Sequence, residues 1–476
     1  NAYEQQILWY NLVKNDVINL MLSGKDWSQT QDILAKRYQR QFRQFARMSS
    51  EDVYNLFINA FMATLDPHTS YLSPKDTEDF VTQMNLSMEG IGATLTVDGD
   101  YVSIVSLVPN GPADKSKQLL VGDRIVAIAQ EGKPLVDVVG WPLDEVVTLI
   151  KGPRGSKVRL EVIPKKKGPN KIITLVRDKI ELEDAKVKQE IKQVDGRKVA
   201  VLSVPSFYLG VTKDTKRHLR TLLSDREVEG VVVDLRMNGG GALIEAIGLS
   251  DLFLPSSAFP VVQVKSSDGK IRIYTKDNTQ SEEVNLLDYL VGKKNSKFYF
   301  DKPMVILVDK LSVSASEIFA AVMQDSGRAV VVGETTFGKG TVQDSVSLER
   351  IYDEYLRPEW KKLGSLRYTT QKFYRISGGS TQLKGVVPDL IMTPIRPELS
   401  ELGERLEKNA LPWDKIPMAN YKKVNHMERY LSRLEREHNR RLAKNSDYQV
   451  VLSHYEQYVE NRYKQRTLSL NLTQRE

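Results

Sequence analysis

Residues 309–343 read DKLSVSASEIFAAVMQDSGRAVVVGETTFGKGTVQ, and this stretch decides the fold around it. The apolar residues 304–308 that precede it predict a buried strand, which ends before a run of small residues at 312–316. Apolar side chains then recur at the spacing of an amphipathic helix that ends near Ser326 and Gly327. A serine at the start of such a helix lies beside backbone N–H groups that have no partner within the helix.

A second predicted strand, residues 328–332, leads into a glycine-rich loop at 333–340. In this loop Lys339 stands between two glycines and follows the aromatic Phe337. Glycine permits a close approach of the backbone. Burial in a confined loop disfavours the charged ammonium and lowers the pKa of a lysine. The neutral amine then becomes available as a base.

A serine hydroxyl is a poor nucleophile until a base takes its proton, and the usual base is histidine. All five histidines are remote in sequence from this stretch. They are His68, His218, His426, His438 and His454. A Ser–His–Asp site would therefore need a histidine folded in from afar, whereas a Ser–Lys pair needs no further residue.

Two motifs in this stretch resemble the C-terminal processing, or tail-specific, proteases, a family of serine proteases with a Ser–Lys dyad. The family's S-A-S-A-S-E pattern reads SVSASE at 312–317. Its G-E-P-T-F-G-K-G pattern reads GETTFGKG at 333–340. Val313 and Thr335 depart from the two patterns, and neither position carries a reacting group.

The resemblance implies roles for four residues. Ser314, the middle serine, would be the nucleophile, and Lys339 would be the base at the spacing that the family requires. Gln343 matches the position that orients the lysine. Asp325, at the end of the predicted helix, matches a polar position near the dyad in close relatives.

A second glycine-rich turn, residues 238–242, follows the predicted strand 230–236 and precedes a helix. A dinucleotide-binding fingerprint would need glycine where Ile244 stands, so that interpretation fails. The resemblance instead implies an oxyanion hole made by the backbone N–H groups of Gly240 and Ala315, with Gly239 as the alternative to Gly240. Loss of one such donor costs about 2.7–4 kcal/mol of transition-state stabilisation.

The lysine-bearing loop is also a near miss to the phosphate-binding P-loop, G-x-x-x-x-G-K-[ST]. Gly340 occupies the position of the hydroxyl that binds magnesium. Residues 341–346 predict a strand where a P-loop requires a helix. Both differences argue against a nucleotide triphosphatase.

Residues 85–180 change to short predicted strands and turns, with one helix after Trp141, and the order of these segments resembles a PDZ domain. In that family a glycine-bearing loop and a strand edge bind an extended peptide and its terminal carboxylate. The matching residues here are Gly90, Ile91, Gly92 and Ala93. The alternative is a small β-rich domain in which the glycines only form turns.

Helical spacing dominates both ends of the chain. The N-terminal region closes with DPHTSYL at 66–72, which resembles a segment that these proteases carry ahead of the PDZ domain. We interpret Asp66 as a turn former and His68 as a structural histidine. The C-terminal helices have a basic face without aromatic or base-reading residues, which argues against a nucleic-acid partner.

The predicted fold is therefore multidomain and mixed α/β (α+β). Its four parts are a helical N-terminal domain at 1–84, a PDZ domain at 85–180, an α/β Ser–Lys protease core at 181–397 and a helical C-terminal domain at 398–476.

Composition narrows the chemistry. The 476 residues include no cysteine, which excludes disulfides, thiol catalysis and cysteine-ligated metals. No His/Asp/Glu cluster has the spacing of metal ligands, so we expect neither a metal nor another cofactor. No apolar run is long enough to span a membrane, and a net charge of +7 favours no particular partner in so long a chain. The N-terminus has no signal-peptide pattern, and we expect a trimmed mature form.

The resemblance implies a serine endopeptidase that degrades or processes proteins recognised by its PDZ domain through apolar C-terminal tails. The longer bacterial members of the family are the most similar, and that resemblance implies a periplasmic location, including peripheral association with the inner membrane. It also implies protein quality control, turnover of cell-wall hydrolases and a lipoprotein adaptor with helical repeats. The alternative is a PDZ-containing adaptor whose protease-like domain is inactive, against which the intact Ser–Lys pair argues.

Overall fold

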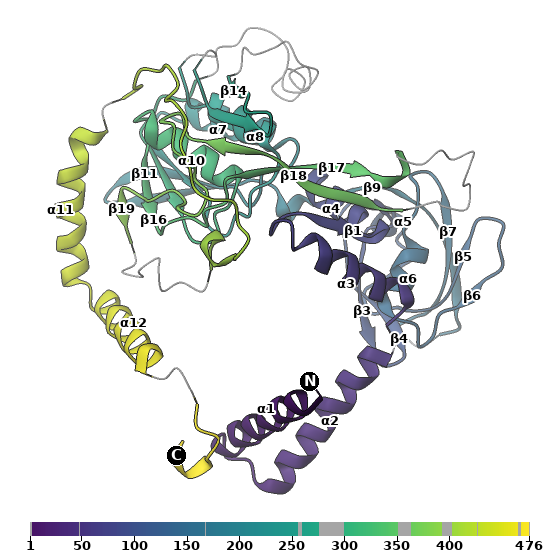
Figure 1. Ribbon diagram of the computed structural model, residues 1–476. Coiled ribbons are helices and arrows are strands. Elements are labelled where there is room, and N and C mark those ends of the chain that lie inside the picture. Colours follow the sequence, from purple (N-terminus) through teal and green to yellow (C-terminus); the bar gives the residue numbers. More distant parts are fainter. Residues whose placement is uncertain are drawn as a thin grey trace.

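Two β-rich bodies lie beside each other, and helices from both ends of the chain extend away from them (Figure 1). The computed structural model describes residues 2–46, 48–166, 168–255, 259–275, 299–350, 363–392, 402–425, 427–464 and 468–475. Each body encloses its own cluster of buried apolar side chains, so the chain has two separate cores.

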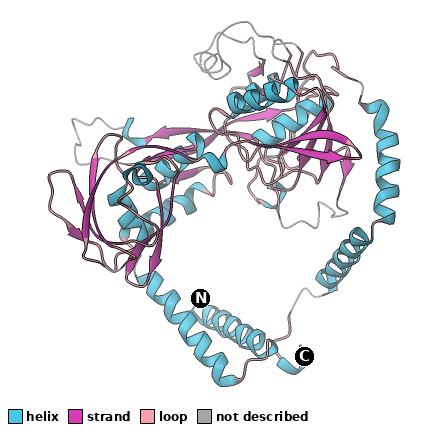
Figure 2. Ribbon diagram, turned by 180° about the vertical axis from the view of Figure 1, so that it is seen from behind, coloured by secondary structure: helices cyan, strands magenta, loops and turns pink. Residues whose placement is uncertain are grey.

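The larger body is built on a six-stranded, mostly parallel sheet (Figure 2). Its order is β10-β11-β12-β15-β16-β19, and β10 alone in this sheet runs antiparallel to its neighbour. The strands are β10 (Lys188–Val194), β11 (Arg197–Ser203), β12 (Val228–Asp234), β15 (Met304–Val308), β16 (Val330–Gly333) and β19 (Leu390–Ile391). The helices that pack with it are α7 (Val211–Ser224), α8 (Leu243–Asp251) and α10 (Ala315–Asp325).

Apolar runs form the central strands because a parallel sheet is covered on both faces. The spacing predicted an amphipathic helix, but α10 is buried on all sides from Ala315 to Met323. Its polar Ser316 and Glu317 are buried because they form hydrogen bonds within the larger body. Its Phe319 packs against Phe207 and Phe253, with ring centroids 6.4 and 5.8 Å apart. This packing fixes the N-terminus of α10 next to the carboxyl ends of β12 and β15.

A second sheet carries a strand from the N-terminal region into the larger body. Its order is β1-β18-β13-β14, and β17 pairs with β18 as well. The strands are β1 (Ser70–Leu72), β13 (Val262–Ser266), β14 (Ile271–Tyr274), β17 (Thr341–Ser347) and β18 (Ser365–Tyr374). Ser70 lies opposite Arg367 in the pairing of β1 with β18. Residues just before β1 are thereby brought near Lys339, which is separated from the start of β17 by Gly340 alone.

The smaller body is a sheet of order β3-β4-β5-β7-β8, with β6 paired to β5. Its elements are β3 (Ala93–Asp98), β4 (Tyr101–Leu107), α5 (Pro112–Ser116), β5 (Arg124–Gln130), β6 (Val136–Asp137), α6 (Leu143–Ile150), β7 (Lys157–Ile163) and β8 (Lys171–Val176). Strand β3 is an edge strand, and α6 contacts it. Where the chain enters and leaves this body, β2 (Ser87–Gly90) pairs with β9 (Asp178–Glu181).

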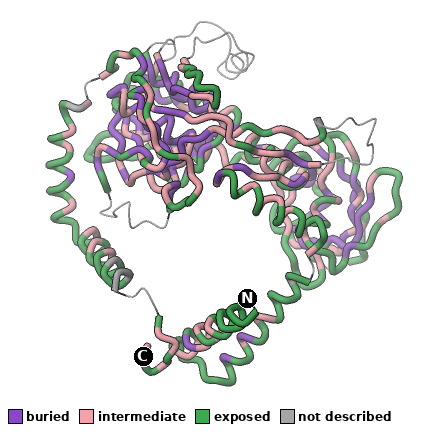
Figure 3. The backbone as a smooth tube through the Cα atoms, viewed as in Figure 1, coloured by how far each residue is buried: buried purple, intermediate pink, exposed green. Residues whose placement is uncertain are grey.

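The remaining elements are helices near the two ends of the chain. They are α1 (Ala2–Leu22), α2 (Trp27–Ala46), α3 (Ser50–Met62), α4 (Pro74–Asn85), α11 (Glu428–Lys444) and α12 (Ser446–Lys464), with 3₁₀ turns at Glu183–Ala185, Leu348–Arg350, Glu404–Leu406 and Leu472–Gln474. Figure 3 shows that these long helices are mostly exposed, while buried residues concentrate in the two bodies. The guanidinium of Arg475 donates to the side chains of Asn15 and Asn19, at 2.9 and 2.8 Å. Among the described helices, none has the length and apolar character needed to cross a membrane.

Candidate active site

Ser314 stands at the turn between β15 and α10, where the backbone is strained. Its φ and ψ are 58° and −110°, a conformation that costs a residue with a Cβ on the order of 1–3 kcal/mol. The neighbouring serines hold this turn in place. The Ser312 hydroxyl donates to the Leu235 carbonyl at 2.8 Å, and the Ser316 hydroxyl donates to the Asn238 carbonyl at 3.0 Å.

The buried carboxylate of Glu317 ties this serine turn to the lysine loop, residues 333–340. Its Oε2 accepts the N–H groups of Ser314 and Lys339, at 2.7 and 3.0 Å. Its Oε1 accepts the Gly338 N–H at 2.7 Å and the Thr336 hydroxyl at 2.6 Å. Burial raises the pKa of Glu317 to about 7, and these four donors oppose the rise. One side chain thus fixes the distance between the two predicted reacting residues.

Lys339 is buried in the loop just before β17, and its ammonium donates to Gln343 Oε1 at 2.5 Å. Burial, and next the positive charge of Arg367, lower the pKa of Lys339 to about 8. The charges of Glu404, Glu317 and Asp66 oppose this fall. No hydrogen bond joins the Ser314 hydroxyl to Lys339 among the described residues, so the lysine is held by Gln343 in this conformation.

Both residues line one pocket of about 650 Å³ between α4 and the larger body. Polar groups of the pocket come from the glycine turn 238–242, the serine turn and β17, and Arg367 adds a positive charge. Apolar side chains form much of the remaining wall. They include Phe80, Met84, Leu182, Leu243, Ile318 and Phe373. The pocket therefore combines reactive groups with space for an apolar side chain.

Gly240 lies directly against the nucleophile position. A Cβ at Gly240 would be 2.9 Å from the Ser314 Cβ and 2.7 Å from the Val313 carbonyl oxygen, and its φ is +96°. The Gly240 N–H donates to Asn238 Oδ1 at 2.9 Å. In the part of the chain that the structure describes, the N–H groups of Ala315 and Gly239 have no hydrogen-bond acceptor.

The structure places Asp325 apart from this pocket. It lies at the C-terminal end of α10, where it accepts hydrogen bonds from Arg375 at 2.5 Å and from the Ser377 hydroxyl at 2.9 Å. This ion pair joins the end of α10 to the chain that follows β18. Asp325 is therefore not brought together with Ser314 and Lys339.

Gly90 ends β2, Ile91 and Gly92 connect it to the edge strand β3, and Ala93 begins β3; all four lie outside the pocket. The carbonyl groups of Ile91 and Gly92 accept the N–H groups of Ala113 and Val108, at 2.8 and 2.9 Å. These two hydrogen bonds fix the loop to residues 108–113 of the smaller body. The outer edge of β3 faces α6. This arrangement fits the addition of a peptide strand.

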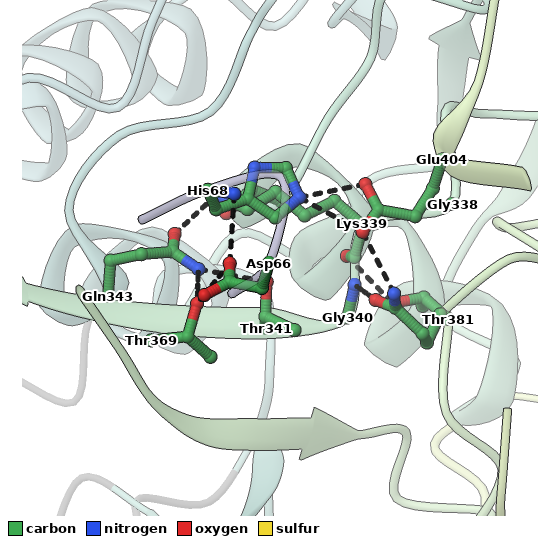
Figure 4. Close-up of polar contacts among 12 residues, drawn as sticks. Asp66, His68, Gly338, Lys339, Gly340, Thr341, Gln343, Thr369, Thr381 and Glu404 are labelled. Atoms are coloured by element: carbon green, nitrogen blue, oxygen red, sulfur yellow. Dashed lines mark hydrogen bonds and ion pairs between the residues drawn. The ribbon is translucent and has the colours of Figure 1, made fainter. Parts of the chain in front are cut away.

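Sequence reasoning assigned only structural roles to Asp66 and His68, and the structure places both in the network around the lysine (Figure 4). Asp66 Oδ1 accepts from the Thr369 hydroxyl at 2.9 Å, and Thr369 Oγ1 accepts from Gln343 Nε2 at 3.1 Å. His68 Nε2 lies 2.8 Å from Glu404 Oε2. The sequence signal for both residues is the DPHTSYL segment at 66–72, which resembles a segment that these proteases carry ahead of the PDZ domain.

Within the described ranges, no group of three or more His, Asp or Glu side chains could hold an ion. The chemistry that the arrangement can support is that of a hydroxyl, an amine of lowered pKa and backbone N–H donors.

Four family models match the chain in succession. They are "Tail specific protease N-terminal domain" at residues 1–75, "PDZ domain" at 81–163, "Peptidase family S41" at 198–392 and "C-terminal domain of tail specific protease" at 398–476. The predicted order of a helical region, a PDZ domain, a protease core and a C-terminal region is confirmed by these matches together with the observed mixture of helices and strands.

Two relatives illustrate the similarity. The chain is 44% identical to the tail-specific protease of Haemophilus influenzae over 471 residues, which is 98% of this chain and 64% of that protein. It is 30% identical to the carboxy-terminal-processing protease of Bartonella bacilliformis over 346 residues, which is 72% of this chain and 70% of that protein. The chain thus spans less than two thirds of the Haemophilus relative.

A solved PDZ domain of the carboxy-terminal protease from Vibrio cholerae, in complex with peptide, is 59% identical; it covers 20% of this chain and all of that one, with a TM-score of 0.20. A photosystem II D1 C-terminal processing protease is 21% identical, covering 80% of this chain and 92% of that one, with a TM-score of 0.37. The resemblance recognised at residues 312–317 and 333–340 is confirmed by the family models and the two relatives, and the chain belongs to the tail-specific proteases of peptidase family S41.

Proposed function

We propose that this protein is a serine endopeptidase in which Ser314 and Lys339 form a Ser–Lys dyad. The observation that carries the proposal is the shared pocket, in which a hydroxyl on a strained turn and a buried lysine are held together through Glu317. A pKa of about 8 leaves roughly a tenth of Lys339 neutral at pH 7, far more than an unperturbed lysine would have, and a general base requires this neutral form.

In the proposed reaction, the Lys339 amine takes the proton of the Ser314 hydroxyl as Oγ attacks the substrate carbonyl. The N–H groups of Ala315 and Gly240 receive the developing oxyanion. Lys339 then gives its proton to the leaving amine, and an ester to Ser314 remains. Water, deprotonated by Lys339, releases the new carboxylate and restores the serine.

Two local changes would complete this geometry. Lys339 Nζ, now bonded to Gln343, must turn toward the Ser314 hydroxyl while Gln343 continues to orient it. The Gly240 N–H, now bonded to Asn238, must turn toward the pocket. Catalytic hydrogen bonds commonly tighten only when substrate is bound. Asp325 would affect catalysis only indirectly, because its ion pair with Arg375 holds the end of α10 that is remote from Ser314.

We further propose that the outer edge of β3, beside α6, selects substrates by their C-terminal tails. An extended tail would pair with β3, and the N–H groups around Gly90–Ala93 would bind its carboxylate. Val146 and Ile150 of α6 are buried in the core, whereas the apolar Leu143, Val147 and Leu149 stay partly exposed and suit apolar tails. The resemblance to the longer bacterial members supports a periplasmic role in protein quality control and cell-wall hydrolase turnover, with a lipoprotein adaptor as partner.

The first test is the degradation of an unstructured protein that ends in a free apolar tail, beside the same protein with an amidated tail. We expect cleavage of the free-tailed substrate and much slower cleavage of the amidated one, because amidation removes the charge that the loop N–H groups bind. Equal cleavage of both would refute carboxylate recognition by residues 90–93. No cleavage of either would favour the alternative of a PDZ-containing adaptor with an inactive protease-like domain.

The pH dependence of cleavage tests the identity of the base. Only the neutral amine of Lys339 accepts a proton, so kcat/KM is expected to rise with pH through a midpoint at about 8. Arg367→Gln removes a positive charge that lowers this pKa, so its midpoint is expected at higher pH. A profile that stays flat from slightly acidic to alkaline pH, with the protein folded throughout, would contradict the assignment of Lys339.

A further inference from the structure

A chain of three hydrogen bonds runs from Lys339 to a carboxylate outside the region that matches the peptidase model. The ammonium of Lys339 donates to Gln343 Oε1 at 2.5 Å. Gln343 Nε2 donates to Thr369 Oγ1 at 3.1 Å, and the Thr369 hydroxyl donates to Asp66 Oδ1 at 2.9 Å. Figure 4 shows this chain beside the His68–Glu404 pair.

Asp66 sets the direction of every hydrogen bond in this chain. Three groups donate to its carboxylate, namely the His68 N–H at 2.8 Å and the hydroxyls of Thr69 and Thr369. Burial raises the pKa of Asp66, but these donors outweigh burial and leave it below its usual value, so the group is a carboxylate that only accepts. The Thr369 hydroxyl must then donate to Asp66 and can only accept from Gln343.

The orientation of the Gln343 amide follows from this. An amide has one end that donates and one that accepts. Because Thr369 accepts, the NH₂ end of Gln343 points to Thr369 and Thr341, at 3.1 and 2.9 Å, and the oxygen is left for the lysine. With the opposite orientation, NH₂ would face the ammonium and two donors would oppose each other.

We propose that Asp66 and Thr369 are positioning residues that fix the amide of Gln343 and, through it, the place of the Lys339 amine. The proposal rests on the proposed Ser–Lys function and extends it to a carboxylate of the N-terminal region. Cross-strand pairing sets the geometry, since Gln343 on β17 lies opposite Thr369 on β18. Pairing of β1 with the same β18 brings Asp66 within hydrogen-bond distance of Thr369.

A second set of contacts holds the Asp66 segment from the other side. His68 Nε2 lies 2.8 Å from Glu404 Oε2, and Gln382 Nε2 donates to Glu404 Oε1 at 2.8 Å. Gln382 Oε1 accepts the Gly340 N–H, next to the lysine, at 2.7 Å. The lysine loop is therefore clamped between residues that precede the PDZ domain and residues that follow the peptidase match.

The test compares Thr369→Val, which keeps the shape and removes the hydroxyl, with Thr370→Val. Thr370 is the next residue on β18, and its hydroxyl donates to Asp344 on the other side of the strand. We expect Thr369→Val to lower kcat by about 10- to 100-fold through misplacement of the amine, with KM little changed because Thr369 does not line the pocket. Thr369→Ser is expected to restore kcat, and Thr370→Val to match the wild type.

The pH profile separates positioning from a general loss of structure. The charged groups that face Lys339 are Arg367, Glu404, Glu317 and Asp66. Loss of the oriented Gln343 oxygen in Thr369→Val, or of the negative charge in Asp66→Asn, removes a group that favours the ammonium. In both variants the kcat/KM midpoint is therefore expected at lower pH than in the wild type. A lower melting temperature of the larger body, with an unmoved pH midpoint of kcat/KM, would overturn the proposal.

Titration of the Lys339 side chain by carbon-13 NMR reads the same coupling without turnover. The Lys339 Cε resonance would be assigned by its loss in Lys339→Ala, and its titration midpoint is expected to fall in Thr369→Val but not in Thr370→Val. An inactive wild type would refute the proposed peptidase function. The titration would still show whether Thr369 and Asp66 position the Lys339 amine. Identical midpoints in the wild type, Thr369→Val and Thr370→Val would refute the proposed positioning of Lys339 by Thr369 and Asp66.

Discussion

Ser314→Ala is expected to abolish peptide-bond cleavage, with a fall in kcat of roughly 10⁶-fold, the effect that loss of a nucleophile has in a serine protease. Alanine fits the turn without new contacts and leaves Glu317 and its donors in place, so the fold should persist. Lys339→Ala is expected to be comparably inactive because no described histidine lines the pocket to replace the base. Cleavage of an unstructured, free-tailed protein measures both effects.

Two results would bear against the dyad. If Ser314→Ala still cleaves, the nucleophile is another residue. If Lys339→Ala alone retains activity, the serine has a different base. A non-additive double variant, no less active than either single variant, is the outcome expected of two groups that act as one unit.

Glu317→Ala is expected to have the largest effect on stability. It leaves the N–H groups of Ser314, Gly338 and Lys339 and the Thr336 hydroxyl without their acceptor, and each buried donor left unpaired costs about 1–3 kcal/mol. Because the variant no longer buries the Glu317 carboxylate, the desolvation cost of that group is also removed, which offsets part of the loss. We therefore expect a net loss of more than about 3 kcal/mol in the free energy of unfolding, together with loss of activity, measured by urea unfolding and cleavage.

Glu229→Ala is the matched control. Glu229 is an exposed carboxylate on β12 of the same body, close to Arg197, and its removal is expected to change stability by less than about 0.5 kcal/mol. Equal stabilities for the two variants would show that Glu317 does not join the serine turn to the lysine loop.

The strands and helices around residues 309–343 could be predicted because local patterns determine them. An apolar run, small residues and a 3.6-residue period appear in order, and α10 begins at Ala315 as that pattern implies. Ser314 and Lys339 were predicted from the same segment, and both line one pocket. Their catalytic roles stay predictions until the variants are measured.

The partners of the lysine could not be predicted in the same way. Asp66 and Thr369 are about 300 residues apart in sequence and meet only because β1 pairs with β18. No periodicity in either segment encodes that pairing. Asp325 shows the converse problem, since its position at a helix end was correct but its side chain turns to Arg375, away from the pocket. Sequence position alone does not determine the direction of a side chain.

The pairing of β2 with β9 has a consequence for how the protein unfolds. The chain enters and leaves the smaller body through two strands that pair with each other, Ser87 opposite Glu181. With its own core and its ends already joined, this body can open without disrupting the larger one. The two cores are then separate cooperative units, so one melting temperature does not describe the chain, and a ligand bound at β3 would stabilise one unit more than the other.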